Sequence, residues 1–285
     1  MTTTTTIATR KVAVGDYELL LNEAGDPANP AVLFLHGAGP GATGLSNWEA
    51  VLSDLSSEFY CLAPDVLGFG DSTHPEPPPQ GLAAFTSLRI QTLIGLIDEL
   101  GLPLVTPVGN SMGGIWTLGM ALQAPTRVDK IVLMGAGGAP IPTGPAIPGL
   151  AGFYNAPSTD AMTAMLEAFV YDPGQFGGDL RRIAERRMPH AVRADVQRSH
   201  VATFSDLDPA NPWSLTAEDV AGITQDVLVI HGREDRFVKF EAGLWFFEHL
   251  PNARLYGIGK CGHWTQIEHH DRFVTALRDF MGGRL

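Results

Sequence analysis

A serine lies between glycines where the chain pattern changes from strand to helix. The run Gly109-Asn110-Ser111-Met112-Gly113 follows the strand-like stretch 105–108 and opens a helical stretch, 112–124. Small residues on both sides let a strand and a helix pack closely around a strained turn that projects the serine hydroxyl. The spacing therefore predicts a nucleophile at Ser111, although the same residues could form an ordinary turn.

A serine hydroxyl is a weak nucleophile unless a general base takes its proton. The chain has nine histidines, and glycine neighbours do not decide between them, because His36 and His263 both have one. His263 follows the last predicted strand, 253–258, and comes after the serine in the chain. We therefore predict His263 as the base.

The carboxylate that orients this histidine should follow an intermediate strand. The stretch 227–230 is that strand, and both Glu234 and Asp235 lie in the loop after it. We favour Asp235, because its position fits a G-x-x-D pattern and completes the chain order Ser, Asp, His. The alternative is that both carboxylates only solvate a turn.

A glycine-rich loop, His36-Gly37-Ala38-Gly39-Pro40-Gly41, follows the apolar stretch 31–35. Small residues there allow backbone N–H groups to approach a developing oxyanion, and the second donor would follow the nucleophile. We predict these donors to be the amides of Ala38 and Met112. A phosphate-binding loop is the alternative, but the loop lacks both the Lys-Ser/Thr ending and a G-x-G-x-x-G pattern.

Strand and helix patterns alternate along most of the chain. The stretches 12–22, 31–35, 59–63, 105–108, 130–134, 227–230 and 253–258 are predicted as strands. With the nucleophile turn, this alternation predicts an α/β-hydrolase fold, with a mostly parallel eight-stranded sheet flanked by helices. The composition changes near residue 135, so we expect core regions at 1–136 and 216–285 and a helical lid at 137–215. Such a lid would cover a site at the carboxyl ends of the strands.

The bulk composition excludes several functions. The net charge of −12 argues against nucleic acid or an anionic membrane as a partner. The two cysteines, Cys61 and Cys261, have no metal-site spacing, and we expect Cys261 to pack rather than react. The threonine-rich start, predicted as a frayed tail, lacks the pattern of a signal peptide, which favours a cytoplasmic location. The scattered histidines predict neither a metal site nor a cofactor, and His269-His270 is typical of a helix start.

Four stretches together resemble one family of α/β hydrolases. HGAGPGATGLSNW, GNSMGG, GREDRFV and KCGHWTQIEH are similar to motifs of the meta-cleavage product hydrolases. That family hydrolyses a carbon–carbon bond in the vinylogous 1,5-diketones formed when catechol rings are opened. The resemblance covers most of residues 30–135 and 222–283.

The resemblance implies a two-stage reaction on a small anionic dienoate. A 2-hydroxy-6-oxo-hexa-2,4-dienoate would ketonise by taking a proton at C5, and Ser111 would then attack C6. The products would be 2-hydroxypenta-2,4-dienoate and a carboxylic acid. The resemblance further implies that Gly39, Asn47, Asn110 and Trp264 lie around the dienoate, and it suggests a homo-oligomer.

The lid is where the chain departs from the family pattern. The resemblance implies an arginine there that pairs with the substrate carboxylate through two parallel hydrogen bonds. Arg186 or Arg187 could take this role, Arg182 fits less well, and we choose Arg186. Any of them could instead belong to a solvated basic helix face. This departure keeps a carboxylesterase with the same triad as the main alternative, while a non-catalytic binding protein is disfavoured because every triad position is filled.

Overall fold

A single sheet crosses the molecule in the computed structural model, which describes residues 6–285. The strand order is β1-β2-β4-β3-β5-β6-β7-β8. Strand β2 pairs antiparallel with β1 and β4, whereas β4, β3, β5, β6, β7 and β8 pair in parallel in that order. The strands are β1 (Ala8–Val14), β2 (Tyr17–Ala24), β3 (Ala31–Leu35), β4 (Tyr60–Pro64), β5 (Thr106–Asn110), β6 (Lys130–Met134), β7 (Asp226–Gly232) and β8 (Ala253–Ile258). The predicted mostly parallel, eight-stranded α/β fold is confirmed.

The first strand prediction was wrong, because the stretch 12–22 is not one strand. It contains the turn of a hairpin, in which Val14 pairs with Tyr17 across Gly15-Asp16. Gly15 has a φ of 55°, a conformation that glycine adopts without steric cost. The apolar residues on both sides of this short turn concealed it in the sequence. The predicted tail at 1–5 lies outside the described residues.

Alternate residues of the central strands point to opposite faces of the sheet and build two separate cores. In β3, Val32 and Phe34 pack with Trp48 and Phe273 on one face. Leu33 and Leu35 pack on the other face with residues of α2 and α3. Because successive side chains of a strand alternate, a strand covered on both faces must be apolar throughout, as AVLFL is.

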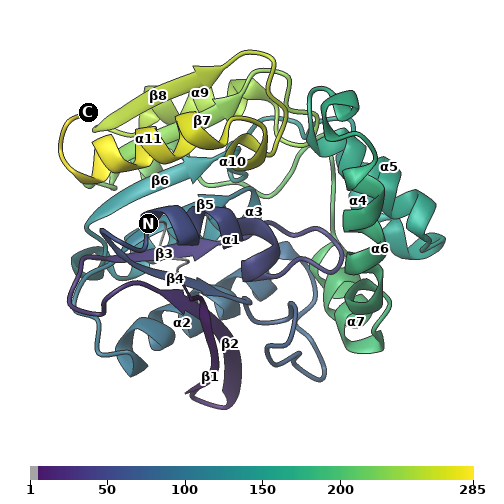
Figure 1. Ribbon diagram of the computed structural model, residues 1–285, viewed down its shortest axis with the longest axis horizontal. Helices are drawn as coiled ribbons and strands as arrows, with labels where there is room; N and C mark the ends of the chain where they lie inside the picture. Colours follow the sequence, from purple (N-terminus) through teal and green to yellow (C-terminus); the bar gives the residue numbers. More distant parts are fainter. Residues whose placement is uncertain (1–5) are drawn as a thin grey trace.

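Helices cover both faces of the sheet, and α1 and α11 lie on the same face (Figure 1). Outside the predicted lid, they are α1 (Gly44–Leu55), α2 (Leu82–Glu99), α3 (Met112–Gln123), α8 (Ala217–Ala221), α9 (Phe240–His249), α10 (Thr265–Glu268) and α11 (His270–Met281), with the 3-10 turn η1 (Pro125–Arg127). Loops after β3, β5, β6, β7 and β8 all reach one end of the sheet, where a pocket lies.

A group of helices inserted between β6 and β7 gathers beyond one end of the sheet (Figure 1). They are α4 (Ile147–Ala151), α5 (Thr159–Phe169), α6 (Asp179–Ala191) and α7 (Ala194–Thr203), with the turns η2 (Phe153–Asn155) and η3 (Pro173–Phe176). We call α4 to α7 the lid helices. Their own apolar cluster includes Leu166 and Leu180, and it continues into Phe237 and Trp264 of the core.

Among the described residues, the structure contains no helix long and apolar enough to cross a membrane.

Candidate active site

Ser111 occupies a sharp turn between β5 and α3. Its φ of 57° is unusual for a residue with a side chain, and such strain persists only where the surroundings impose it. The surroundings here are tight, because a Cβ on Gly109 would lie 2.4 Å from the Gly113 carbonyl oxygen. A Cβ on Gly113 would lie 2.3 Å from the Leu35 oxygen. The flanking glycines therefore let β5, α3 and β3 meet at the turn, as a nucleophile elbow requires.

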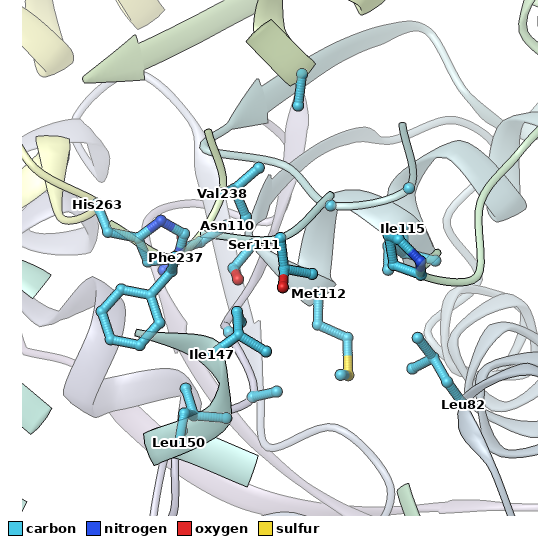
Figure 2. A pocket seen from close by; sticks show the side chains of 18 of the residues that line it. Leu82, Asn110, Ser111, Met112, Ile115, Ile147, Leu150, Phe237, Val238 and His263 are labelled. Carbon is cyan, nitrogen blue, oxygen red and sulfur yellow. The ribbon is translucent and has the colours of Figure 1, made fainter. Parts of the chain in front are cut away.

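His263 and Asp235 form a buried pair at the same end of the sheet. The Nδ1–H group of His263 donates to Oδ2 of Asp235 over 2.6 Å, and the two side chains are at most 1% exposed. His263 lines the same pocket as Ser111, and Figure 2 shows both side chains at that cavity. The structure thus brings together the three residues that the sequence predicted as a triad.

Asp235 is held as a carboxylate by its neighbours. Burial alone would raise its pKa, but the charge of His263 and hydrogen bonds from His231 and His263 outweigh burial and lower the pKa below its ordinary value. Its Oδ1 atom also accepts from the backbone N–H groups of Phe237 and Val238, at 2.8 and 3.0 Å. Asp235 therefore stays ionised beside the imidazole.

Glu234, the other carboxylate in this loop, has a different role in the structure. It accepts from the amide of Cys261 at 3.1 Å and pairs with Arg233. Glu234 therefore braces the loops, and Asp235 contacts the histidine.

The glycine-rich loop lies beside the serine, and its small residues allow this approach. Ala38 and Met112 both line the pocket. Among the described residues, neither amide donates to a backbone carbonyl. Met112 is the first residue of α3, where backbone N–H groups have no partner inside the helix. Both predicted amides are thus available to an oxyanion.

His36 connects the glycine-rich loop to the segment after β4 through hydrogen bonds at both ring nitrogens. Its Nε2 atom accepts from the Val66 amide at 3.0 Å, so its Nδ1–H group donates to the Gly37 oxygen at 2.8 Å. Burial lowers the pKa of His36 to about 4, so the ring stays neutral near pH 7. His36 therefore fixes the loop and is not positioned as the base.

A polar cluster lies next to Ser111. Asn110 donates through Nδ2 to Oδ1 of Asn47 at 3.0 Å, and both line the pocket. The buried Oδ1 atom of Asn110 has no hydrogen-bond partner in the described part of the chain, so it can accept from a ligand O–H group. Trp264, 5% exposed, lines the same pocket and stacks on Phe169 at 4.6 Å between ring centroids.

The choice of Arg186 as the lid arginine that faces the pocket was wrong. Arg186 is exposed and does not line the pocket, whereas Arg187 is buried and does. The buried residues of α6 are Leu180, Ala184, Arg187 and Ala191, which share one helix face. This spacing is visible in the sequence, and anchoring the helix phase on its apolar residues would have selected Arg187.

Arg187 is a buried cation with unused donors. Its Nε–H group donates to the Pro40 oxygen at 2.6 Å. Burial lowers its pKa to about 10, which still leaves it charged at neutral pH. Among the described residues, no carboxylate forms an ion pair with it. A Cβ on Gly39 would lie 2.6 Å from Nη2, so the glycine makes room for the guanidinium.

The rest of the pocket is apolar, and the sequence did not single out these residues one by one. Figure 2 shows Leu82, Ile115, Ile147, Leu150 and Val238 around it. They come from α2, α3, α4 and the loop after β7, so no single motif carries them. Phe237 and Phe169 pack against the His263 ring, with centroids 5.3 and 5.5 Å away.

The loop that carries the histidine is fastened to the lid. The amides of His263 and Trp264 both donate to the carbonyl oxygen of Phe169, the last residue of α5, at 2.7 and 3.2 Å. Glu268 accepts from the Gly262 and Tyr171 amides at 2.7 and 2.6 Å. The position of His263 therefore depends on the end of α5.

The remaining candidates take no part in this chemistry. Burial raises the pKa of both Cys61 and Cys261 to about 12, so neither thiol is an activated nucleophile. Within residues 6–285, no group of three His, Cys, Asp or Glu side chains could hold a metal ion.

Comparison with known proteins gives consistent results. Residues 30–270 match the alpha/beta hydrolase fold family. The chain is 33% identical over 276 residues to the 2-hydroxy-6-oxo-2,4-heptadienoate hydrolase of Pseudomonas putida, with 95% of each chain covered. It is 36% identical over 276 residues to the 2-hydroxy-6-oxononadienedioate/2-hydroxy-6-oxononatrienedioate hydrolase of Cupriavidus pinatubonensis, covering 94% of this chain and 91% of that one. The solved structure of a Rhodococcus 2-hydroxy-6-oxo-6-phenylhexa-2,4-dienoate hydrolase matches with a TM-score of 0.91 at 35% identity, covering 97% of this chain and 99% of that chain.

Proposed function

The chain belongs to the meta-cleavage product hydrolases, carbon–carbon bond hydrolases of the alpha/beta hydrolase fold, and on that premise we propose a specific reaction for it. It hydrolyses the C5–C6 bond of a 2-hydroxy-6-oxo-hexa-2,4-dienoate. The products are 2-hydroxypenta-2,4-dienoate and a carboxylic acid. This places the enzyme in the breakdown of aromatic compounds.

One observation carries the proposal. Arg187, a buried arginine that pairs with no carboxylate of residues 6–285, lines the same pocket as Ser111 and His263. An unpaired buried charge is costly, and an anionic ligand would remove that cost. A carboxylate matches the guanidinium geometry, so Arg187 binds the substrate carboxylate in this proposal.

The first step is a proton transfer. A carbon leaving group departs poorly unless its electron pair can be delocalised. Protonation at C5, with loss of the 2-hydroxyl proton, gives a 2,6-dioxo intermediate. Asn47, Asn110 and Trp264 surround the dienoate, and the free Oδ1 atom of Asn110 can accept from the 2-hydroxyl group.

The second step is nucleophilic attack by Ser111 on C6. His263 takes the serine proton, and Asp235 stabilises the imidazolium that forms. The amides of Ala38 and Met112 stabilise the oxyanion at C6. The C5–C6 bond then breaks, its electron pair passes into the dienolate, and the imidazolium of His263 gives its proton to that leaving group. Water then hydrolyses the acyl-enzyme with His263 as the base.

The structure also supports an apolar acyl group on C6. The pocket wall beyond Ser111 consists of side chains such as Ile115, Ile141 and Trp213. Transfer of an alkyl or aryl group onto such a wall is favourable. Residues 137–215 act as the lid over this end and exclude water, with the core regions at 1–136 and 216–285.

The test uses a coloured meta-cleavage dienolate. We expect its visible absorbance to disappear with the wild-type enzyme, and we expect Ser111→Ala to release neither the pentadienoate nor the carboxylic acid. Product analysis should identify the pentadienoate and the carboxylic acid in equal amounts. Persistent absorbance together with rapid cleavage of simple aryl esters would instead support the carboxylesterase alternative. Arg187 argues against that alternative, because a neutral ester does not need a buried cation.

The assembly and location are part of the proposal. We propose a homo-oligomer, because the outer edge of β8 is unpaired among the described residues and Phe247 and Tyr256 are exposed near it. Light scattering after gel filtration measures its mass, and a monomer at working concentration would contradict it. Two free, buried cysteines are consistent with a cytoplasmic enzyme.

A further inference from the structure

The catalytic carboxylate contacts a second histidine that the triad does not include. His231, near the end of β7, is fully buried. Its Nε2 atom lies 2.9 Å from the Val238 oxygen and 3.4 Å from Oδ2 of Asp235. This Oδ2 atom is the one that accepts from His263. Asp235 therefore has an imidazole nitrogen on each side of one oxygen.

The surroundings fix which ring nitrogen of His231 is the donor. A carbonyl oxygen only accepts, so Nε2 must carry the proton that it shares between Val238 and Asp235. Among the described residues, the buried Nδ1 atom has no hydrogen-bond partner, so a proton there would leave a buried donor unsatisfied. Nε2 is thus the donor nitrogen of His231.

The fold makes room for this ring. A Cβ on Gly243 of α9 would lie 2.7 Å from Nδ1 of His231. Phe240, one turn earlier in α9, meets the ring edge-on, with centroids 5.6 Å apart. Helix α9 therefore fixes the ring against Asp235 with a glycine on one side and an aromatic ring on the other.

We propose that His231 is a positioning residue of the triad, which donates to Asp235 and limits how strongly that carboxylate attracts a proton onto His263. Asp235 then accepts three hydrogen bonds, and the Nε2–H group of His231 adds a longer polar contact, 3.4 Å from Oδ2. A second donor at Oδ2 weakens the attraction between this oxygen and the imidazolium of His263. The result is a base that stays neutral, and so able to accept the serine proton, to lower pH. This inference rests on the triad roles in the proposed function.

The variants separate this role from simple packing. His231→Phe keeps a ring and removes the donor, while His231→Gln can donate from a similar position. Gly243→Ala keeps His231 but moves its ring. Phe240→Leu is the matched control, because it weakens packing on His231 without removing any donor to Asp235. The other ionisable groups on the neighbouring elements stay the same in every variant: Arg187, Arg233, Glu234, Arg236, Lys239, Glu241, Cys261 and Glu268.

The main measurement is an NMR titration of the His263 imidazole in the full-length protein. Loss of the His231 donor should raise the pKa of His263 by about half a unit or more, because the carboxylate then stabilises the imidazolium more strongly. We expect this shift in His231→Phe and Gly243→Ala. His231→Gln and Phe240→Leu should titrate like the wild type.

The kinetic measurement is the acid limb of the pH profile of kcat/KM. It should move to higher pH by the same amount in His231→Phe, with KM unchanged on the alkaline side. Unshifted titrations of His231→Phe and Gly243→Ala, or an equal shift in Phe240→Leu, would overturn the inference. The NMR titration needs no turnover, so a chain that failed to hydrolyse dienoates would contradict the proposed function and still test His231.

Discussion

The residues proposed for bond cleavage and the arginine proposed for charge recognition come from regions of different construction. Ser111, Asp235 and His263 all follow strands of one sheet, where backbone hydrogen bonds and glycine contacts fix their positions. Arg187 comes from a lid helix and lines the same pocket. With the proposed roles, the core would determine the reaction, whereas the lid would determine which anion is held for it.

Removal of the nucleophile should give the largest effect. We expect Ser111→Ala to lower turnover at least about 10⁴-fold and still bind the dienolate, because only the core chemistry is lost. Stopped-flow absorbance separates the two quantities. Cys261→Ser is the control and should retain most of the activity. Residual turnover of Ser111→Ala near the wild-type level would show that the core does not determine the reaction.

Removal of the lid cation should have an intermediate effect of a different kind. Arg187→Gln removes a charge-assisted contact, so kcat/KM should fall about 100-fold, mainly through KM. Arg186→Gln, one residue away and exposed, is the matched control and should behave like the wild type. Equal losses in the two variants would remove the distinction between the two regions.

The lid should also make the free energy of unfolding depend on pH. His200 in α7 is buried, and burial lowers its pKa to about 4. An unfolded histidine titrates near 6.5, so between these values only the unfolded chain binds the proton, and stability falls as pH falls. From pH 7 to pH 5 this amounts to about 2 kcal/mol for one such group.

His200→Gln keeps a donor for the Leu150 oxygen, which Nε2 contacts at 3.1 Å. Urea unfolding at the two pH values should show a smaller acid loss for this variant than for the wild type. Identical acid losses would mean that His200 does not titrate between the two states. His36 in the core, with a pKa of about 4, should contribute its own loss in both proteins.

Weakening the link between the two regions should have the smallest effect. A glutamine at Glu268 can accept from only one of the Gly262 and Tyr171 amides, so kcat of Glu268→Gln should fall about fivefold, the contribution of one hydrogen bond. Glu248→Gln, an exposed site on α9, is the control. Steady-state kinetics on a dienolate measures both, and an unchanged kcat would mean that the link does not support His263.

The difference between the core and the lid also separates the site residues that the sequence predicts from those that it does not. Ser111 follows its strand within a glycine pattern that few other structures need, and Asp235 and His263 follow the strands expected for them in chain order. The lid has no strand ends to mark its positions, so selecting Arg187 over Arg186 requires the phase of α6. The apolar end of the pocket was not predictable, because Leu82, Ile115 and Val238 meet only through tertiary packing.

His231 shows a further limit of sequence patterns. It occupies a buried strand position, where its neighbours in the chain give no reason to connect it with Asp235. The connection depends on the space left by Gly243, which lies on another element.

The carbonyl oxygen of Phe169 accepts from two amides, and this has a consequence for how a substrate enters the pocket. The amides of His263 and Trp264 both donate to it. If the end of α5 moved away to admit a molecule, the histidine loop would lose these hydrogen bonds and His263 would lose its position. Entry is therefore expected through the segment 207–213, after α7, where Leu207, Pro212 and Trp213 line the cavity and Trp213 is 36% exposed to solvent.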